Sequence, residues 1–320
     1  MPTIRFKDKD YDCPNSENLL DSLNRQGANL PFSCCAGHCW TCMSKATQGQ
    51  PPAASQAGLK DTQKAQGYFL PCVCKPEMDL HIEAMRITSS KWQSTVIQKS
   101  QLSDTVVRLR LQKPAAFTYH AGQYVAFFQQ GKQRCYSLAS INSEPLLEFH
   151  IRRVPEGKVS TWLCDEVQEG DQLHFSDVRG DCFYIPNSQP LLLLATGTGL
   201  APLYGIMRQA ITQQHPAPIH IFHSCNDVES LYYRQELAAI SAQYAHVTYD
   251  SCVVAATQQG DVLQGDMVQL LQQSQYDWAA DDWAGWRVYL SGKPDILDQL
   301  RLLCLQKGVR NMDIYADAFT

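Results

Sequence analysis

Residues 191–202 read LLLLATGTGLAP, an apolar run that passes through two glycines into a helical pattern. The uninterrupted apolar residues 191–195 are typical of a strand buried on both faces, and residues 201–213 have the apolar spacing of a helix. The alternation continues downstream, with strands expected at 219–223 and 288–291 and helices at 231–241 and 294–307. This rhythm predicts a doubly wound, parallel α/β domain over residues 188–320.

The glycine turn in this stretch indicates a phosphate ligand. Gly197 and Gly199 permit a close approach of the backbone, and a helix that begins near Ala201 directs the positive end of its dipole toward an anion. The spacing is not G-x-G-x-x-G, so the turn alone is weak support for a dinucleotide site.

Residues 89–187, upstream of this domain, favour antiparallel strands, expected at 95–99, 105–112, 124–128 and 146–154. Among them, RCYSLAS (134–140) places Arg134 and Tyr136 on one face of an extended strand. Arg134 can pair with a phosphate, Tyr136 can stack on an isoalloxazine ring, and Ser137 can hydrogen-bond near flavin N5. The alternative is an ordinary core strand.

A second string in the same region, GKVSTWL (157–163), follows a strand and reads as a glycine turn that starts a helix. The free N–H groups of such a turn suit a pyrophosphate. The alternative is an ordinary helix cap in which Ser160 satisfies backbone donors.

The N-terminal region carries a cysteine-rich loop, PFSCCAGHCWTC (31–42), followed by a further cysteine in GYFLPC (67–72). Four of these thiols have the C-x4-C-x2-C…C spacing of a plant-type [2Fe–2S] cluster: Cys34, Cys39, Cys42 and Cys72. The alternative is structural zinc, which usually pairs two C-x2-C hairpins, whereas this chain has one. Cys35 and Cys74 are then spare thiols.

The composition excludes several other classes of protein. With 320 residues, 44% hydrophobic and 18% charged, the chain can bury large cores and is not disordered. A net charge of −5 argues against nucleic acid as a partner. No apolar run approaches the ~20 residues of a membrane helix and no export signal is evident, so we expect a cytoplasmic protein, in which thirteen cysteines indicate metal or redox ligands before disulfides.

These strings together resemble two known families. PFSC-x-AGxC-x-x-C and GYFLPC resemble plant-type ferredoxins, which implies a β-grasp domain over residues 1–88 with the four cysteines above as ligands. RCYS, GKVS, GTGLAP and the terminal DAFT resemble the ferredoxin–NADP reductase superfamily. That resemblance implies a six-stranded antiparallel FAD-binding β-barrel over residues 89–187 and a nicotinamide domain over residues 188–320.

The resemblance also implies site residues. For FAD they are Arg134, Tyr136, Ser137, His150, Ile151, Arg152, Gly157, Lys158, Val159, Ser160 and Phe319. For the nicotinamide coenzyme they are Gly197, Thr198, Gly199, Ala201, Pro202, Asn226 and Gly292. The implied catalytic residues are Ser137 and Ser291, the latter standing where many relatives carry cysteine. For Phe319 the alternative is a frayed hydrophobic tail.

The choice of coenzyme follows from charge. After the strand at 219–223 the chain offers SCNDVES (224–230), with no cation before Arg234. A 2′-phosphate needs arginine or lysine, and the carboxylates of Asp227 and Glu229 would repel it. The sequence therefore predicts NADH rather than NADPH.

The order of the three regions resembles NADH-dependent reductase components that serve Rieske dioxygenases, diiron monooxygenases or deoxysugar dehydrases. It implies electron flow from NADH to FAD, then to the [2Fe–2S] cluster, then to a protein acceptor. Two alternatives are a ferredoxin-like carrier with inert appended domains and a terminal flavin enzyme that acts directly on a small molecule.

Overall fold

The computed structural model describes residues 2–14, 16–30, 35, 37, 42–84, 92–273 and 282–319. The chain folds into two compact units, residues 1–88 and 89–320. Among the described helices, none has both the length and the apolar character needed to cross a membrane.

The first unit is built on a five-stranded sheet of order β2-β1-β5-β3-β4. β1 pairs antiparallel with β2 and parallel with β5. The elements are β1 (Thr3–Phe6), β2 (Lys9–Asp12), α1 (Leu19–Arg25), β3 (Ser44–Gln48), η1 (Ala53–Gln56), α2 (Asp61–Ala65), β4 (Tyr68–Phe69), η2 (Pro71–Val73) and β5 (Leu80–Ala84). Helix α1 begins where the Asn18 side chain accepts a hydrogen bond from Asp21 N–H, and it buries Leu19, Leu20 and Leu23 in the core of this unit.

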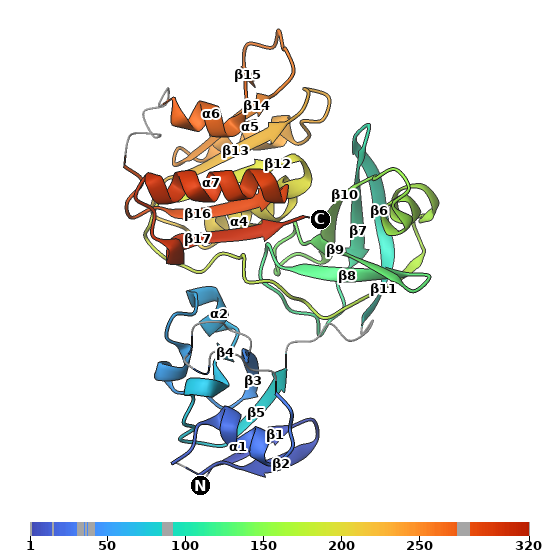
Figure 1. The fold of residues 1–320 in the computed structure, drawn as a ribbon. Coiled ribbons are helices and arrows are strands. Elements are labelled where there is room, and N and C mark those ends of the chain that lie inside the picture. The colour runs from blue at the N-terminus through green and yellow to red at the C-terminus, as the bar shows by residue number, and fades with distance from the viewer. Residues whose placement is uncertain are drawn as a thin grey trace. The chain divides into compact units, whose positions relative to one another are not determined.

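The N-terminal half of the second unit is a six-stranded antiparallel sheet of order β10-β7-β6-β11-β8-β9, which we call the flavin half (Figure 1). Its elements are β6 (Trp92–Ser103), β7 (Val106–Gln112), β8 (Tyr124–Gln129), β9 (Lys132–Ser137), β10 (Leu146–Arg152), α3 (Lys158–Thr161), η3 (Trp162–Glu166) and β11 (Gln172–Phe175). The six antiparallel strands were predicted. The closed barrel is not observed, because β9 and β10 are the two edges of the sheet and no strand pairing joins them in the described part of the chain. Both edges instead contribute side chains to a cavity described below.

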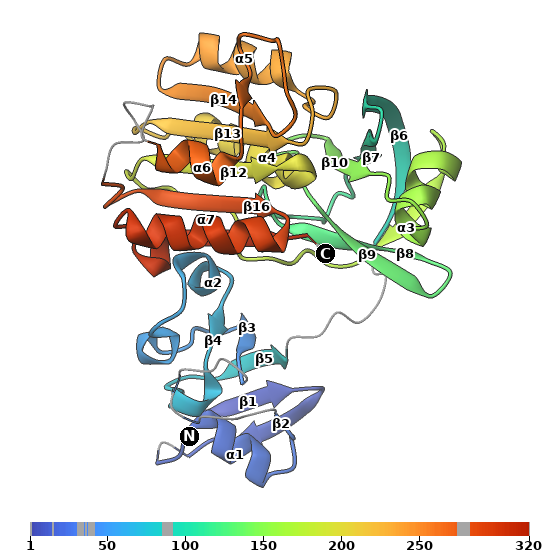
Figure 2. The same cartoon turned by 45° about the horizontal axis from the view of Figure 1, so that its top comes forward.

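The C-terminal half is a six-stranded parallel sheet of order β15-β14-β13-β12-β16-β17, which we call the nicotinamide half (Figure 2). Its elements are β12 (Leu191–Thr196), η4 (Gly197–Gly199), α4 (Leu200–Thr212), β13 (Ile219–Cys225), α5 (Arg234–Gln243), β14 (Val247–Val253), β15 (Leu263–Gln264), α6 (Met267–Gln272), β16 (Arg287–Gly292), α7 (Pro294–Gln306), η6 (Asn311–Asp313) and β17 (Ile314–Ala318). Helices α4 and α5 pack on one face of the sheet and α6 and α7 on the other, as the doubly wound pattern predicts.

Strand β12 lies at the switch point of this sheet, with β13 on one side and β16 on the other. Ligands of such sheets bind at the carboxyl ends of the strands beside this point. Two glycines let the strand ends meet there. A Cβ atom on Gly199 would lie 2.1 Å from the Ser291 carbonyl oxygen, and one on Gly292, whose φ is +140°, would lie 1.9 Å from Thr196 Oγ1.

Helix α5 begins at Arg234, three residues later than the sequence pattern predicts. Tyr233 has a left-handed backbone conformation, with φ of 60°, which ends the preceding turn. The turn directs the Tyr232 and Tyr233 side chains toward β10 of the flavin half, where both form hydrogen bonds. Hydrogen bonds to β10 thus take the place of the first helical turn that the sequence pattern predicts.

Candidate cofactor-binding sites

A cavity of about 700 Å³ lies between the flavin half and the nicotinamide half of the second unit. Its volume is in the range of cofactor pockets. Most of the predicted binding residues line it: Arg134, Tyr136, Ser137, His150, Arg152, Gly157, Lys158, Val159, Ser160, Gly197, Thr198, Ala201, Asn226, Gly292 and Phe319. Strings that lie far apart in the sequence therefore share one cavity.

Four predicted residues are not in its wall. Ile151 is fully buried in the core of the flavin half, and Pro202 is buried in the first turn of α4. Gly199 packs its turn against the backbone of Ser291. Ser291 is fully buried, and its hydroxyl donates to the Asp317 carbonyl oxygen at 3.3 Å. For these residues the geometry favours a supporting role.

The flavin half presents its predicted strings to the cavity from β9 and the start of α3. Arg134 is exposed, and Tyr136 is half-buried with its ring centroid 5.9 Å from that of Phe127. Ser160 Oγ accepts from Val154 N–H at 3.3 Å and donates to the Gly157 carbonyl at 3.2 Å. The N-cap of α3 is Gly157 and no side chain caps it, so the capping role considered for Ser160 is wrong; its hydroxyl instead ties Val154 to Gly157 across the glycine turn.

The charge of the cavity wall suits a cofactor with phosphates. The flavin half contributes four cations to the wall: Lys132, Arg134, Arg152 and Lys158. The nicotinamide half contributes Lys293, while Glu156 and Asp266 are the carboxylates among the described lining residues. Cations outnumber carboxylates, so the residues present fit a dinucleotide that carries a pyrophosphate.

Asp317, on β17, was not predicted as a site residue, yet both predicted catalytic serines contact it. Ser137 Oγ donates to Asp317 Oδ2 at 2.9 Å, and Ser291 Oγ donates to its carbonyl oxygen. Burial raises the pKa of the Asp317 carboxyl to about 6 even though the Ser137 hydrogen bond lowers it. The site therefore holds a carboxyl group that can gain and lose a proton near neutral pH.

The backbone that follows Asp317 is hydrogen-bonded as far as Phe319. β17 pairs with β16, and Phe319 N–H donates to the Gly292 carbonyl at 2.9 Å. Phe319 lies in the cavity wall, so the frayed-tail alternative is wrong.

Two of the four predicted cluster ligands can be located. Cys42 lies just before β3 and Cys72 lies in η2, and both are buried free thiols. Burial raises the pKa of the Cys42 thiol to about 11, and the Cys72 thiol beside it adds to the rise. Cys34 and Cys39 lie outside the described residues. The described pair fits the convergence of thiolates that an iron–sulfur cluster requires.

The spare thiols differ from each other. Cys74 is fully buried, and burial raises the pKa of its thiol to about 12, so it stays protonated. Cys35 is exposed and has a positive φ of 52°.

Comparison with known proteins places each region in a family. Residues 3–77 match the 2Fe-2S iron-sulfur cluster binding domain, residues 93–184 the oxidoreductase FAD-binding domain, and residues 193–301 the oxidoreductase NAD-binding domain. The reductase subunit of an aromatic O-demethylase from Amycolatopsis is 30% identical over 73% of this chain and 75% of its own length. The ferredoxin–NAD(P)+ reductase component of a naphthalene 1,2-dioxygenase system from Pseudomonas putida is 28% identical over 94% of this chain and 93% of its own. The chain belongs to the ferredoxin–NAD(P)+ reductase family.

Solved structures agree with this reductase fold. A cytochrome P450 reductase from Amycolatopsis superposes with a TM-score of 0.67 at 24% identity, covering 100% of this chain and 99% of its own. A ferredoxin reductase from a carbazole 1,9a-dioxygenase system gives a TM-score of 0.64 at 23% identity, covering 100% and 98%. The protein is an NAD(P)-dependent oxidoreductase with binding domains for a [2Fe–2S] cluster, FAD and the nicotinamide coenzyme.

Some site residues of the reductase were missed by the sequence analysis. Asp317 is the first residue of the DAFT string, which was used only for Phe319, and a carboxylate in the otherwise apolar segment IYADAF was the available signal. Ser230, Asp266 and Lys293 line the nicotinamide side of the cavity but belong to no motif that names them. Their positions depend on the fold rather than on local spacing.

Proposed function

We propose that this reductase accepts hydride from NADH at a flavin in the cavity and delivers single electrons through a [2Fe–2S] cluster on Cys34, Cys39, Cys42 and Cys72. The observation that carries the proposal is the shared cavity, which is lined both by Ser137 of the RCYS strand and by Gly197 of the glycine turn. The proposed domains are residues 1–88, 89–187 and 188–320, with a β-grasp fold in the first and an open flavin-binding barrel in the second.

The chemistry of the bound groups explains the order of the domains. A bound flavin would accept two electrons as hydride and release them singly, and the cluster would be the one-electron exit. The chain's own residues bind and orient: Arg134 pairs with a cofactor phosphate, and Tyr136 covers a ring face. Ser137 and Asp317 form a hydrogen-bonded pair that can hold the proton released during one-electron output.

The preference for NADH rests on the charges near the end of β13. Arg234, the first cation after that strand, is already held by Asp261 at 2.7 Å and by the Gln259 side chain. Asp227 accepts from Ser230 N–H at 2.9 Å, so its carboxylate stays in this turn. Asp266 adds a carboxylate to the same side of the cavity. This arrangement suits a ribose hydroxyl better than a 2′-phosphate.

The proposed acceptor is a protein component of an oxygenase or hydroxylase system. The relatives support this, since two of them are a naphthalene 1,2-dioxygenase reductase component and the phenol hydroxylase P5 protein. Reconstitution with candidate oxygenase components should give NADH-dependent product formation with the acceptor that this chain serves.

A cluster-free variant tests the electron path. Cys42→Ser should retain FAD and reduce ferricyanide with NADH, because hydride transfer depends on the second unit alone. The same variant should fail to reduce cytochrome c or an oxygenase component. Cys74→Ser, which changes another buried thiol of the same unit, is the matched control and should keep both activities.

The same assay separates the alternatives. A ferredoxin-like carrier would show no bleaching of a flavin band when wild-type protein is mixed with NADH without oxygen. Full cytochrome c reduction by Cys42→Ser would instead indicate a terminal flavin enzyme and would overturn the proposed relay.

A further inference from the structure

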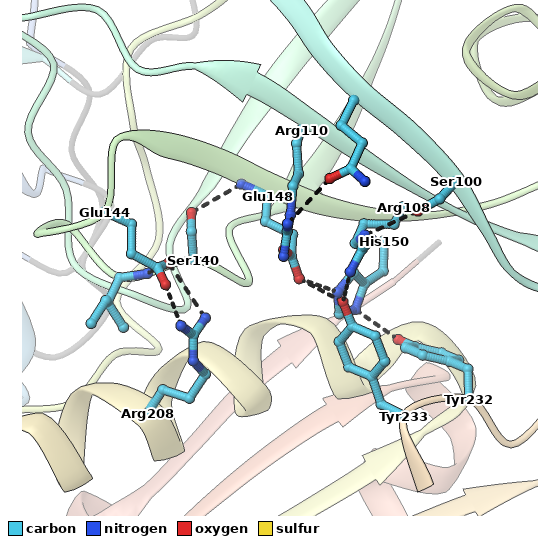
Figure 3. Close-up of polar contacts among 12 residues, drawn as sticks. Ser100, Arg108, Arg110, Ser140, Glu144, Glu148, His150, Arg208, Tyr232 and Tyr233 are labelled. Carbon is cyan, nitrogen blue, oxygen red and sulfur yellow. Dashed lines mark hydrogen bonds and ion pairs between the residues drawn. The ribbon is translucent and has the colours of Figure 1, made fainter. Parts of the chain in front are cut away.

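A buried, hydrogen-bonded cluster joins the two halves of the second unit (Figure 3). Its members, which we call the interface cluster, come from β7 and β10 of the flavin half and from the turn before α5 of the nicotinamide half: Arg108, Arg110, Glu148, His150, Tyr232 and Tyr233. None of its hydrogen bonds is explained by cofactor binding alone.

Glu148 is the shared acceptor of this cluster. The residue is 3% exposed, and its Oε1 atom is 3.0 Å from His150 Nε2 and 2.9 Å from the Tyr233 hydroxyl. Its Oε2 atom accepts from Arg110 Nε at 2.6 Å. Burial opposes ionisation, but the hydrogen bond from His150 and the Arg110 guanidinium outweigh it and lower the pKa of Glu148. Glu148 is therefore a carboxylate that only accepts.

The charge of Glu148 fixes the proton positions along the cluster. Burial lowers the pKa of His150, so the imidazole is neutral at physiological pH. Because Glu148 can only accept, His150 Nε2 carries the ring proton and Nδ1 is an acceptor. The Tyr232 hydroxyl, 3.1 Å from Nδ1, must then donate to it. The Glu148 carboxylate thus orients the His150 imidazole on its own strand. Through this imidazole it also orients the Tyr232 hydroxyl of the nicotinamide half.

The chain of contacts reaches the glycine turn. His150 and Tyr232 both lie in the cavity wall, with their rings edge to face at 5.1 Å. On its other side the Tyr232 ring contacts the buried His223 ring at 5.6 Å. His223 Nε2 donates to the Gly197 carbonyl at 2.9 Å, in the turn predicted to hold the nicotinamide coenzyme.

We propose that Glu148 is a positioning residue that fixes the flavin half against the glycine turn at the separation hydride transfer requires. The inference rests on the proposed function, since it assigns the flavin to one wall of the cavity and the nicotinamide to the other. Small changes in donor–acceptor geometry change such rates strongly, so a cluster that holds both walls acts on the chemical step rather than on affinity.

The variant Glu148→Gln tests the proposal in the holoenzyme. A glutamine has one acceptor oxygen, so its NH2 group must face either Arg110 or the donors from His150 and Tyr233. In anaerobic stopped-flow mixing with NADH, the limiting rate of flavin reduction should fall about tenfold, while the apparent Kd for NADH changes little. The deuterium isotope effect on this step should become more temperature-dependent. Tyr233→Phe, which removes one donor, should show a smaller decrease in the rate of flavin reduction, again with little change in the apparent Kd for NADH. This second variant tests the proposal even if Glu148→Gln loses its flavin.

A second measurement does not depend on activity. In 15N spectra of the histidine-labelled holoenzyme, His150 should give the neutral Nε2–H pattern from pH 7 to 8, assigned by its loss in His150→Asn. That pattern should change in Glu148→Gln. A protonated His150 over this range in the wild type would overturn the proton order and with it the proposal.

The matched control is Glu144→Gln. Glu144 also forms an ion pair between the halves, with Arg208 of α4, but its hydrogen bonds go to Arg208 and to Ile141 N–H rather than to the interface cluster, so this variant should leave the rate of flavin reduction unchanged. Equal slowing by Glu144→Gln, or wild-type rates in both Glu148→Gln and Tyr233→Phe, would overturn the positioning role. If the wild type itself failed to reduce flavin with NADH, the proposed function would fall first.

Discussion

Replacing Asp317 by asparagine should stabilise the reductase while impairing its one-electron output. Asparagine has the same shape and can still accept from the Ser137 hydroxyl, which donates to Asp317 Oδ2 at 2.9 Å. The substitution therefore removes one charge and one titratable proton and little else.

The magnitude follows from the pKa of the carboxyl. An aspartate of an unfolded chain titrates near ~3.9, whereas burial raises the pKa of Asp317 to about 6. The folded state thus binds this proton more tightly. Its contribution to stability is fully present below pH ~3.9 and is lost as the pH rises through 6. Two pKa units correspond to roughly 3 kcal/mol, the penalty for ionised Asp317 at pH 8.

Thermal unfolding of the holoenzyme measures this effect. Asp317→Asn should raise Tm by several degrees at pH 8, and the gain should shrink by about half at pH 5, where the wild-type carboxyl is mostly protonated. Cytochrome c turnover at pH 8 should fall on the order of 10²-fold, because the variant lacks a proton acceptor beside Ser137. A Tm difference that is the same at both pH values, together with wild-type turnover, would refute the raised pKa and the proton-holding role.

Three further predictions concern the cofactors. Cys72→Ser should lose the two iron atoms per chain expected for a [2Fe–2S] cluster while Cys74→Ser keeps them, as iron analysis and the visible spectrum would report; the reverse pattern would contradict the ligand assignment. Arg134→Ala should weaken FAD binding by about 1.5–3 kcal/mol, measured by equilibrium dialysis, because it removes a charged partner of the phosphate. An unchanged affinity for FAD would indicate that RCYS is an ordinary core strand. Wild-type kcat/KM should be higher with NADH than with NADPH, and Ser230→Arg should reduce this difference by adding a cation to the cavity wall. The Asp227 side chain accepts from the Ser230 backbone N–H, so the substitution leaves this hydrogen bond in place. A wild-type preference for NADPH would contradict the charge argument.

Local spacing predicted much of this molecule because the features it concerns are local. The apolar run Leu191–Ala195 and the glycines after it determine a strand, a turn and a helix within about twenty residues. The cysteine-rich loop and RCYS are also short strings, and the residue types within each string indicate its ligand. In each case the neighbours that matter are near in the sequence, so residue type and period suffice.

Contacts between the halves could not be predicted in the same way. Glu148 and His150 occupy alternate positions of LLEFHIR, and that pattern places them on one face of a strand without naming a partner. Their partners, Tyr232 and Tyr233, follow more than eighty residues later, in a segment whose composition favours helix. In this segment the hydrogen bonds to Glu148 and His150, which form only in the folded unit, outweigh the intrinsic preference for helix.

The two buried carboxylates at this interface divide the work between them. Glu148 accepts from His150, Tyr233 and Arg110, and the hydrogen bond from His150 and the Arg110 guanidinium lower its pKa, so it is ionised at physiological pH. Asp317 has a single serine donor and a pKa of about 6, so it exchanges its proton under physiological conditions. A carboxylate that stays ionised can hold its donors at a fixed distance but cannot move a proton. A carboxyl group that titrates can move a proton but holds its donors less firmly. The donors around each carboxylate therefore separate positioning from proton handling at the interface between the two halves.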